Sequence, residues 1–389
     1  MRIGIDYTAA ARQRAGIGRY ARELITALFA LESGHRYVLF AATGGVSRAH
    51  WRREVNGLRA IRNLQFAICN LPLSDDWLAR LWQRLRVPIP VEAITGALDA
   101  FYSPDFVLPP TLPRTRTLLT VHDLSFLRCP EAFVPALRRY LERVVPRSVA
   151  RADRVLADSE ATRADLIALL GVPPEKVQVL YSGVHPRFCP RPEPDETARL
   201  RARYGLGDAP YVLSVGTLQP RKNYVRLIRA FVQLTNQPTN QPTNQLTNQL
   251  VIAGGRGWLY EETLAEAGKY PDRVRILGFV DDGDLPALYR NAALFVFPSL
   301  YEGFGLPVLE AMACGVPVVC SNASSLPEVA GDAALLVDPL DTDGLTMAMA
   351  RVLEDPDLRR GMIARGLEQA ARFTWERAAL QLLTALETL

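Results

Sequence analysis

The sequence predicts an α/β protein built from two successive open parallel sheets. Its 389 residues exceed one small domain, so about two domains are expected. Short apolar runs alternate with segments of helical periodicity along the whole chain, which is the pattern of parallel α/β sheets. The chain is 49% hydrophobic and 22% charged, with a mean hydropathy of +0.02. This composition excludes a wholly disordered chain, a collagen-like fibre and a small disulfide-linked scaffold.

The expected strands are short runs rich in Val, Ile, Leu and Phe. In the first half they are Arg2–Asp6, Tyr37–Ala41, Leu64–Ile68, Ala100–Tyr102, Thr117–Val121, Arg154–Ala157 and Val177–Leu180. In the second half they are Tyr211–Val215, Leu250–Ala253, Val274–Leu277, Leu294–Phe297, Pro317–Cys320 and Ala334–Val337. The amphipathic stretches between them include Gly18–Leu31 and Val225–Leu234, and Trp375–Leu389 is expected to form the last helix.

Prolines mark the expected domain boundary. Four of them lie between residues 186 and 194, where neither a helix nor a central strand can continue. We therefore expect a first domain at residues 1–190, a second at 191–370 and a final helical segment at 371–389. Within the second domain, residues 235–250 read TNQPTNQPTNQLTNQL, a repeat with no apolar face. We predict a disordered surface loop at residues 235–249.

The charge is distributed unevenly. Residues 1–190 hold 26 Lys and Arg against 17 Asp and Glu, and residues 191–389 hold 19 against 24, so the halves carry net charges of +9 and −5. The basic first half is consistent with an anionic partner, such as phosphate groups or an acidic membrane surface, and equally with an Arg-rich composition. We expect no nucleic-acid partner.

The cysteines and the N-terminus indicate the cytoplasm. The five cysteines form no C-x-x-C pair and lie far in sequence from the four histidines, so we expect reduced thiols. No apolar run is long enough to cross a bilayer, and Asp6 falls where a signal peptide would keep its apolar segment.

Residues 297–310, FPSLYEGFGLPVLE, carry the most informative motif. A strand ends there, a glycine-containing loop follows, and Pro307 suits the first turn of a helix. The N-terminus of such a helix, at the carboxyl end of a strand in an open sheet, suits an anion such as diphosphate. Glu302 and Glu310 could each accept hydroxyl hydrogen bonds from a sugar or ribose. Considered alone, the two glutamates would more often be a loop cap and a solvated helix acid.

Residues 214–223, SVGTLQPRKN, form a second motif. A strand leads through Gly216 into a loop with the adjacent cations Arg221 and Lys222. Both could bind a diphosphate and stabilise it as a leaving group, or they could lie on a solvated turn.

The spacing of the two glutamates, followed by AMACGVPVV at residues 311–319, closely resembles the retaining glycosyltransferases of the GT-B fold, glycosyltransferase family 4. The resemblance implies two Rossmann-like domains that face each other across a cleft, with a C-terminal helix crossing back to the first domain. It implies that Glu302 bonds hydroxyls of the donor sugar and Glu310 the nucleotide ribose. The same resemblance assigns backbone contacts with the sugar and phosphates to the loop residues Gly303, Phe304, Gly305 and Leu306.

The resemblance extends to other strand ends. It implies that His122, in VHDLSFL, faces the donor sugar, although a lone histidine after a strand is usually structural. Many family members carry an arginine directly after Gly216, where this chain has Thr217, and Arg221 could stand in for it. Further residues implied to lie near the donor are Gly16, Gly18, Gly254 and Val280. The G-x-G-x-x-A pattern at Gly16 follows the first strand too late for a dinucleotide-binding turn, which disfavours an oxidoreductase.

The implied reaction moves a sugar from a nucleoside-diphosphate sugar to an acceptor hydroxyl with retention of anomeric configuration. We expect GDP-mannose as donor, with a UDP-hexose as the alternative, and a glycan or lipid-linked acceptor. No cofactor or metal ion is implied, because no Asp-x-Asp or histidine cluster accompanies the two cations. Alternatives are a GT-B nucleotide-sugar epimerase or phosphorylase, or a non-catalytic sugar-nucleotide-binding scaffold. The basic segment Asp76–Arg86, with two tryptophans, could contact the inner face of a membrane or pack as an ordinary helix.

Overall fold

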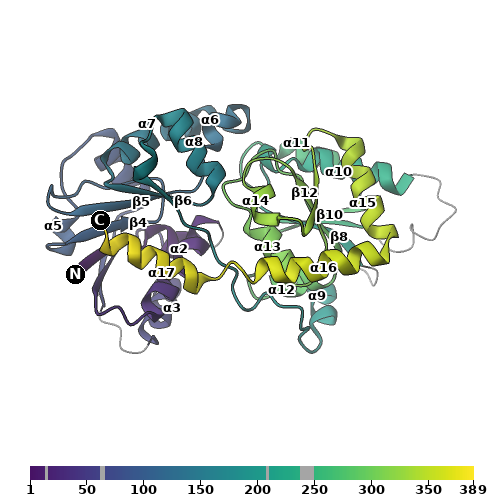
Figure 1. Cartoon of the computed structure of the whole chain (residues 1–389), viewed down its shortest axis with the longest axis horizontal. Helices are drawn as coiled ribbons and strands as arrows, with labels where there is room; N and C mark the ends of the chain where they lie inside the picture. Colours follow the sequence, from purple (N-terminus) through teal and green to yellow (C-terminus); the bar gives the residue numbers. More distant parts are fainter. Residues whose placement is uncertain (14–15, 62–65, 207–209, 237–248) are drawn as a thin grey trace. The chain divides into compact units, whose positions relative to one another are not determined.

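The computed structural model describes residues 1–13, 16–61, 66–206, 210–236 and 249–389. These residues divide into two compact units (Figure 1). The first unit comprises residues 1–124, 139–183 and 374–389, and the second comprises residues 125–138 and 184–373. Most of the predicted repeat loop, residues 237–248, lies outside the described residues. Its first two residues, Thr235 and Asn236, are the end of a helix instead.

The first unit is a seven-stranded parallel sheet in the order β3-β2-β1-β4-β5-β6-β7. Its strands are β1 Arg2–Asp6, β2 Arg36–Ala42, β3 Phe66–Leu71, β4 Ala100–Ser103, β5 Arg116–Val121, β6 Arg154–Ala157 and β7 Val177–Val179. Its helices are α1 Thr8–Arg12, α2 Ile17–Ala30, α3 Arg48–Arg59, α4 Asp75–Leu78, α5 Glu92–Thr95, α7 Pro135–Arg151, α8 Glu160–Leu170 and α17 Trp375–Glu387, with the π-helical turn η1 Ala79–Arg84 and the short 3₁₀ turn η3 Pro174–Lys176. The first four residues of α7 belong to the second unit.

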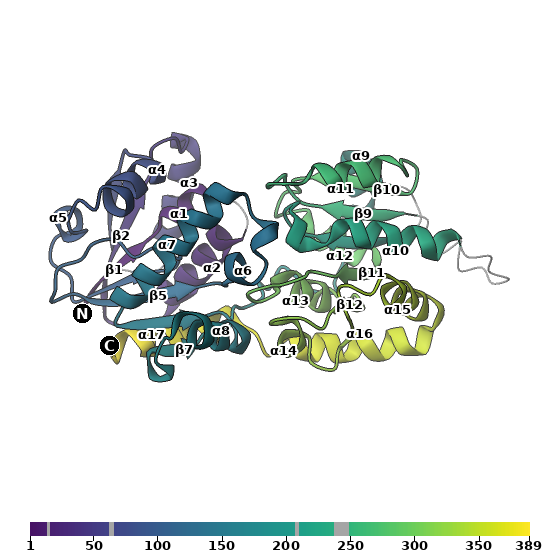
Figure 2. The same ribbon diagram turned by 90° about the horizontal axis from the view of Figure 1, so that it is seen from above.

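The second unit is a six-stranded parallel sheet in the order β10-β9-β8-β11-β12-β13. Its strands are β8 Tyr211–Val215, β9 Leu250–Ala253, β10 Val274–Gly278, β11 Ala292–Phe297, β12 Val318–Ser321 and β13 Ala334–Val337. Its helices are α6 Ser125–Arg128, α9 Glu196–Tyr204, α10 Tyr224–Asn236, α11 Glu261–Gly268, α12 Leu285–Arg290, α13 Leu306–Ala313, α14 Leu326–Ala330, α15 Thr342–Glu354 and α16 Pro356–Ala370, with the 3₁₀ turns η2 Pro130–Ala132 and η4 Pro220–Lys222. Helix α10 packs against α11 and α15 (Figure 2).

Every strand predicted from the sequence is present, with ends that differ by at most a few residues. The described part of β3 begins at Phe66, since residues 62–65 lie outside the described residues. The strands are covered by helices on both faces, so their sequences are nearly continuous apolar runs that stand out from the helices. Both sheets have the strand order of doubly wound nucleotide-binding folds, which confirms the predicted fold class.

The C-terminal helix α17 completes the core of the first unit. Its apolar side, including Trp375, Ala379 and Leu382, is buried with Tyr20 and Leu24 of α2. The helices α2 and α17 lie side by side (Figure 1). The backbone at Trp375 approaches Gly183 so closely that a Cβ atom at residue 183 would lie 2.1 Å from the Trp375 nitrogen. The last helix of the chain is therefore an integral part of the first unit.

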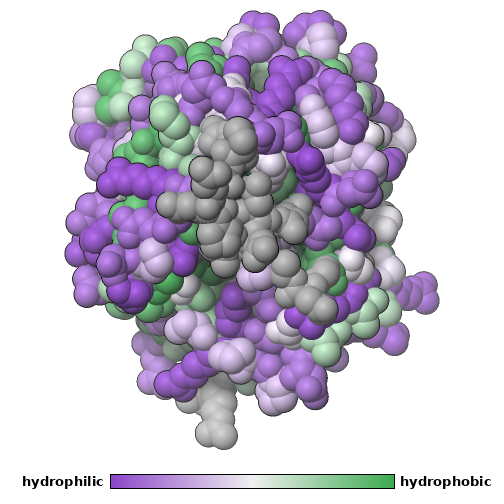
Figure 3. Space-filling model, turned by 90° about the vertical axis from the view of Figure 1, so that its right-hand side faces the viewer, coloured by the Kyte–Doolittle hydropathy of each residue, from purple (hydrophilic) through white to green (hydrophobic). Residues whose placement is uncertain are grey.

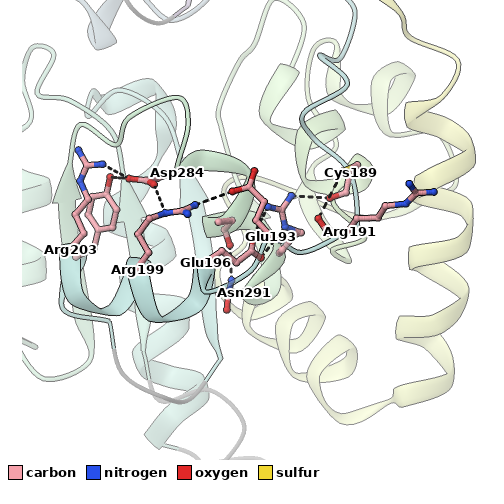
Figure 4. A network of polar contacts seen from close by, with 11 residues as sticks. Cys189, Arg191, Glu193, Glu196, Arg199, Arg203, Asp284 and Asn291 are labelled. Carbon is pink, nitrogen blue, oxygen red and sulfur yellow. Dashed lines mark hydrogen bonds and ion pairs between the residues drawn. The ribbon is translucent and has the colours of Figure 1, made fainter.

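The proline-rich segment after residue 183 belongs to the second unit, and a network of charged side chains fixes it there (Figure 4). Arg290 of α12 bonds Glu196 through Nε and Oε1 at 3.0 Å and donates to the Cys189 carbonyl at 3.1 Å. Asp284 accepts from Arg199 at 3.2 Å and from Arg203 at 2.6 Å. The predicted boundary at residue 190 thus lies after the point where contacts change unit, because prolines exclude regular structure without indicating what the segment packs on.

Residues 125–138 come from the first half of the sequence and yet belong to the second unit. The indole nitrogen of Trp258 donates to the Ala132 carbonyl at 2.7 Å, and the rings of Trp258 and Phe133 lie 5.5 Å apart. The sequence contained no signal for this exchange, since the contact is made between residues far apart along the chain.

The surface, the helices and the cysteines bear on where the protein could reside. On the face of the second unit shown in Figure 3, hydrophobic residues are scattered among hydrophilic ones. Within the described residues, no helix combines the length and the apolar character that crossing a membrane would need. All five cysteines are free thiols.

Candidate functional site

The two predicted motifs of the second unit lie on neighbouring strands. The SVGTLQPRKN motif follows β8 and the FPSLYEGFGLPVLE motif follows β11, and these two strands pair in parallel in the centre of the sheet. The strand order reverses between them, and ligands of open α/β sheets bind outside the carboxyl ends of the strands at such a point. The topology therefore brings together two loops that are 80 residues apart in sequence.

Three side chains from these loops form one buried cluster. Glu302 contacts Lys222 through Oε1 and Nζ at 2.6 Å, and Arg221 through Oε2 and Nη1 at 2.8 Å. Glu302 is 7% exposed and Lys222 8%. Burial alone would raise the pKa of Glu302, but Arg221 and Lys222 lower it by more, to about 2. The glutamate is therefore an anion at neutral pH, and we call these three residues the Glu302 cluster.

Each cation of the Glu302 cluster has a second anchor. The ammonium of Lys222 lies 4.7 Å from the centroid of the Phe297 ring, within the range of a cation–π contact. The guanidinium of Arg221 donates to the Tyr301 carbonyl. Both positive charges are thus fixed at the end of β11 independently of the glutamate.

Hydrogen bonds hold the backbone of the loop that carries Glu302. Its N–H donates to Ser324 Oγ at 2.8 Å, and its carbonyl accepts from Ser325 Oγ at 3.0 Å. Ser325 also donates to the Phe304 carbonyl at 2.6 Å. Gly305 has a φ of +120°, where a side chain would also meet Leu326. Helix α13 begins directly after it at Leu306, as the position of Pro307 predicts.

Two glycines bring backbone segments together beside the cluster. A Cβ atom on Gly254, after β9, would lie 1.9 Å from the carbonyl oxygen of Gly216, after β8. Gly254 also donates to the Gly278 carbonyl at 2.8 Å at the end of β10. Only a residue without a side chain fits at position 254, and Gly216 has a φ of +156°, which other residues rarely adopt, so both predicted glycines have a structural explanation.

The remaining predicted donor residues of this unit lie in α13, after β10 and in the loop before α13. Glu310 is buried in α13, where one of its oxygens accepts from the Tyr289 hydroxyl at 2.9 Å. Val280 is buried just after β10, and Gly303 lies in the loop before α13. The contacts of Glu310 and Val280 with a nucleotide stay predictions.

The predicted residues His122, Gly16 and Gly18 belong to the first unit. Both ring nitrogens of His122 have partners, with Nδ1 2.7 Å from Asp158 Oδ2 and Nε2 3.0 Å from the Pro104 carbonyl oxygen. Burial alone would lower the pKa of His122, but Asp158 and other neighbours raise it to about 9. Asp158 directly follows β6, so its strand-end position was the available signal for a partner that the sequence analysis missed.

The two N-terminal glycines have structural explanations of their own. Gly16 precedes α2 with a φ of +58°, and a Cβ on Gly18 would lie 2.2 Å from the Gln13 carbonyl oxygen. Tyr20, one turn into α2, stacks edge-on against the His122 ring with centroids 4.8 Å apart. The predicted contacts of Gly16 and Gly18 with donor and acceptor stay predictions.

Other polar residues of the site were not predicted. Ser324 and Ser325 follow β12, and Tyr289 lies in α12, where nothing in their local sequence indicates a role. Their contacts are made to residues about 20 positions away, so only the fold reveals them. Among the described residues, no group of three or more His, Cys, Asp or Glu side chains is arranged to hold a metal ion.

Comparison with known proteins gives the family. Residues 196–369 match the model of the glycosyl transferases group 1, and residues 14–188 match that of Glycosyltransferase Family 4. The chain is 35% identical over 379 residues to the O-antigen chain mannosyltransferase B of Escherichia coli, with 96% of both chains covered. It is 33% identical over 269 residues to the serotype-specific mannosyltransferase WbdA of Escherichia coli, which is 68% of this chain and 32% of that protein.

The fold has solved counterparts. The crystal structure of Anabaena HepE in complex with UDP-glucose aligns over the whole of both chains with a TM-score of 0.72, at 18% identity. Because the sequence matches extend through both units, the predicted family is confirmed along with the fold. The protein belongs to glycosyltransferase family 4 and is a retaining hexosyltransferase of the GT-B fold.

Proposed function

We propose that the protein transfers a mannosyl group from GDP-mannose to a hydroxyl group of a glycan or lipid-linked acceptor. The names of the two Escherichia coli relatives support mannose as the sugar, and the first of them supports an O-antigen-type glycan. A UDP-hexose is the alternative donor, because HepE binds UDP-glucose in its crystal structure. The observation that carries the proposal is the Glu302 cluster at the switch point of the second sheet.

In the proposed mechanism, Lys222 and Arg221 hold the donor diphosphate and stabilise the charge that develops as it leaves. The N-terminus of α13 adds favourable backbone dipoles, and Gly216, Gly254 and the loop from Gly303 to Leu306 allow close backbone approach. Glu302 accepts hydroxyl hydrogen bonds from the sugar. The acceptor attacks from the same face, and the leaving phosphate takes its proton. Following the family resemblance, we also propose that His122 contacts the donor sugar and that Glu310 contacts the ribose. Val280 is proposed to contact the base, and Gly16 and Gly18 to lie near the phosphates.

The donor is tested by thermal unfolding with a panel of nucleotide sugars. A ligand at 100 times its dissociation constant stabilises the folded protein by about 2.7 kcal/mol, which raises Tm measurably. We expect the largest rise in Tm with GDP-mannose. A chelator should leave this rise unchanged, because Arg221 and Lys222 bind the diphosphate without a metal ion. A rise with UDP-sugars alone would refute GDP-mannose, and strict dependence on magnesium would contradict the role of Arg221 and Lys222.

We further propose a cytoplasmic protein that contacts the inner face of the membrane through the segment Asp76–Arg86 of the first unit and the residues next to it. In this region Trp77 is 54% exposed, Leu85 66% and Ile89 50%, beside the exposed Arg80 and Arg84. Other side chains of the segment pack inward, Trp82 against Phe40 among them, so both interpretations of the sequence apply to part of it. Exposed aromatic and aliphatic side chains among arginines suit an anionic interface.

Vesicle sedimentation tests this contact. We expect the protein to sediment with vesicles of phosphatidylglycerol and phosphatidylethanolamine, and the double variant Trp77→Ser/Leu85→Ser to lose most of this binding. The variant Leu380→Ser, which removes an exposed leucine of α17, serves as the control and should bind normally. Equal binding by all three proteins would refute the contact.

A further inference from the structure

The Glu302 cluster pairs one carboxylate with two cations before any substrate is considered. Each carboxylate oxygen of Glu302 contacts a different cation, at 2.6 Å for Lys222 and 2.8 Å for Arg221. All three side chains are largely buried, so water screens their attraction weakly. The Glu302 carboxylate is therefore paired with the same two cations that, in the proposed function, bind the donor diphosphate.

Carboxylate and phosphate oxygens both accept charge-assisted hydrogen bonds from Lys and Arg. A diphosphate that binds these two cations must therefore share them with Glu302 or displace it. We propose that Glu302 competes with the diphosphate for Arg221 and Lys222, and thereby makes the enzyme bind the intact nucleotide sugar in preference to the free nucleoside diphosphate. This inference rests on the proposed function, since it requires the two cations to bind the donor diphosphate.

Only the side chain of Glu302 has to move for the diphosphate to replace it. The backbone of Glu302 is fixed on both sides by Ser324 and Ser325, so the loop does not need to move. When the Glu302 carboxylate moves away, Lys222 still has its cation–π contact with Phe297. Arg221 still has its hydrogen bond to the Tyr301 carbonyl. A rotation of the Glu302 side chain is thus sufficient to expose two cations that are already in position.

The sugar decides which arrangement is favoured. In the proposed donor complex, hydroxyls of the sugar give Glu302 new hydrogen-bond partners that replace the two cations. After transfer the nucleoside diphosphate carries no sugar, so Glu302 loses these partners and is again drawn to Arg221 and Lys222. The same carboxylate then favours donor binding and assists release of the product.

Calorimetric titration with GDP, inorganic pyrophosphate and GDP-mannose tests the competition. Glu302→Gln removes the carboxylate that bridges the two cations, so we expect GDP and pyrophosphate to bind about tenfold tighter or more, a change of 1.4 kcal/mol per factor of ten. GDP-mannose should gain less, because the substitution also weakens the sugar contact, so the preference for intact donor should fall. Glu266→Gln is the matched control, since Glu266 of α11 also bridges an arginine and a lysine, Arg229 and Lys269, and should leave all three affinities unchanged.

Lys222→Met separates the inference from the proposed function. If it leaves pyrophosphate and GDP binding intact, the cation role in the proposed function is wrong. If it weakens them while Glu302→Gln binds them no more tightly than the native protein, only the competition is refuted. Should Glu302→Gln fold poorly, pyrophosphate is expected to raise its Tm more than that of the native protein, and a smaller or equal rise would overturn the inference.

Discussion

Replacing Glu302 by alanine is expected to lower kcat about 10- to 150-fold, which corresponds to the roughly 1.5–3 kcal/mol of a hydrogen bond to a charged group. The loss follows from the proposed bonds between this buried carboxylate and hydroxyls of the donor sugar, which orient the sugar for transfer. We expect the loss in kcat more than in KM for the donor, since the cations that bind the diphosphate remain. Release of nucleoside diphosphate in the presence of acceptor measures it.

Glu266→Ala provides the control for this substitution. It also removes a buried carboxylate from between an arginine and a lysine, but on α11 rather than in the loop after β11. We expect Glu266→Ala to lower the stability of the protein. Its kcat, measured below the unfolding temperature of the variant, should equal that of the native protein. Full activity in Glu302→Ala, or an equal loss of kcat in both variants, would remove Glu302 from the mechanism.

Arg290→Met is expected to destabilise the second unit by about 3–5 kcal/mol, because it leaves the buried carboxylate of Glu196 without its cation. Burial would raise the pKa of Glu196, while its hydrogen bonds from Arg290 and from the Glu193 backbone lower it by more. The contribution of the pair is therefore present above the unfolded-state pKa of 4.5 and is lost as the pH falls below it. The lowest-temperature transition in calorimetry at pH 7 and at pH 4 measures both effects.

Two further variants make this test specific. Arg199→Met removes a more exposed arginine of the same network, whose partner Asp284 keeps Arg203 and Tyr204, so the loss should be at most about 1 kcal/mol. The double variant Glu196→Leu/Arg290→Met should recover much of the loss, since it leaves no buried charge. A small effect of Arg290→Met, or a double variant as unstable as the single one, would contradict the argument.

The fold was predictable from the sequence because its strands are buried on both faces. The run Leu250–Ala253 is apolar throughout and Tyr211–Val215 is interrupted only by Ser214, and the ends of both runs coincide with the observed β9 and β8. The position of α13 was also predictable, since Pro307 and Gly315 bracket it. Local chemistry determined these elements.

The site was predictable only in part. The motifs identified Glu302, Arg221 and Lys222 as separate candidates, and the pairing of β8 with β11 joins them into one cluster. Their mutual ion pairs, the serine bonds to the loop and the Asp158 partner of His122 depend on contacts between distant segments. No pattern along the chain encodes those contacts, so they could not be predicted.

The first unit contains a helix, α17, that the ribosome makes only after the whole of the second unit. Until α17 emerges, the side chains of α2 that it covers, Tyr20 and Leu24 among them, have no partner on that side. The nascent first unit must then wait through the synthesis of the entire second unit with an apolar face uncovered. Such a face is a binding site for chaperones during translation, and a chain that terminates before residue 374 would expose it permanently.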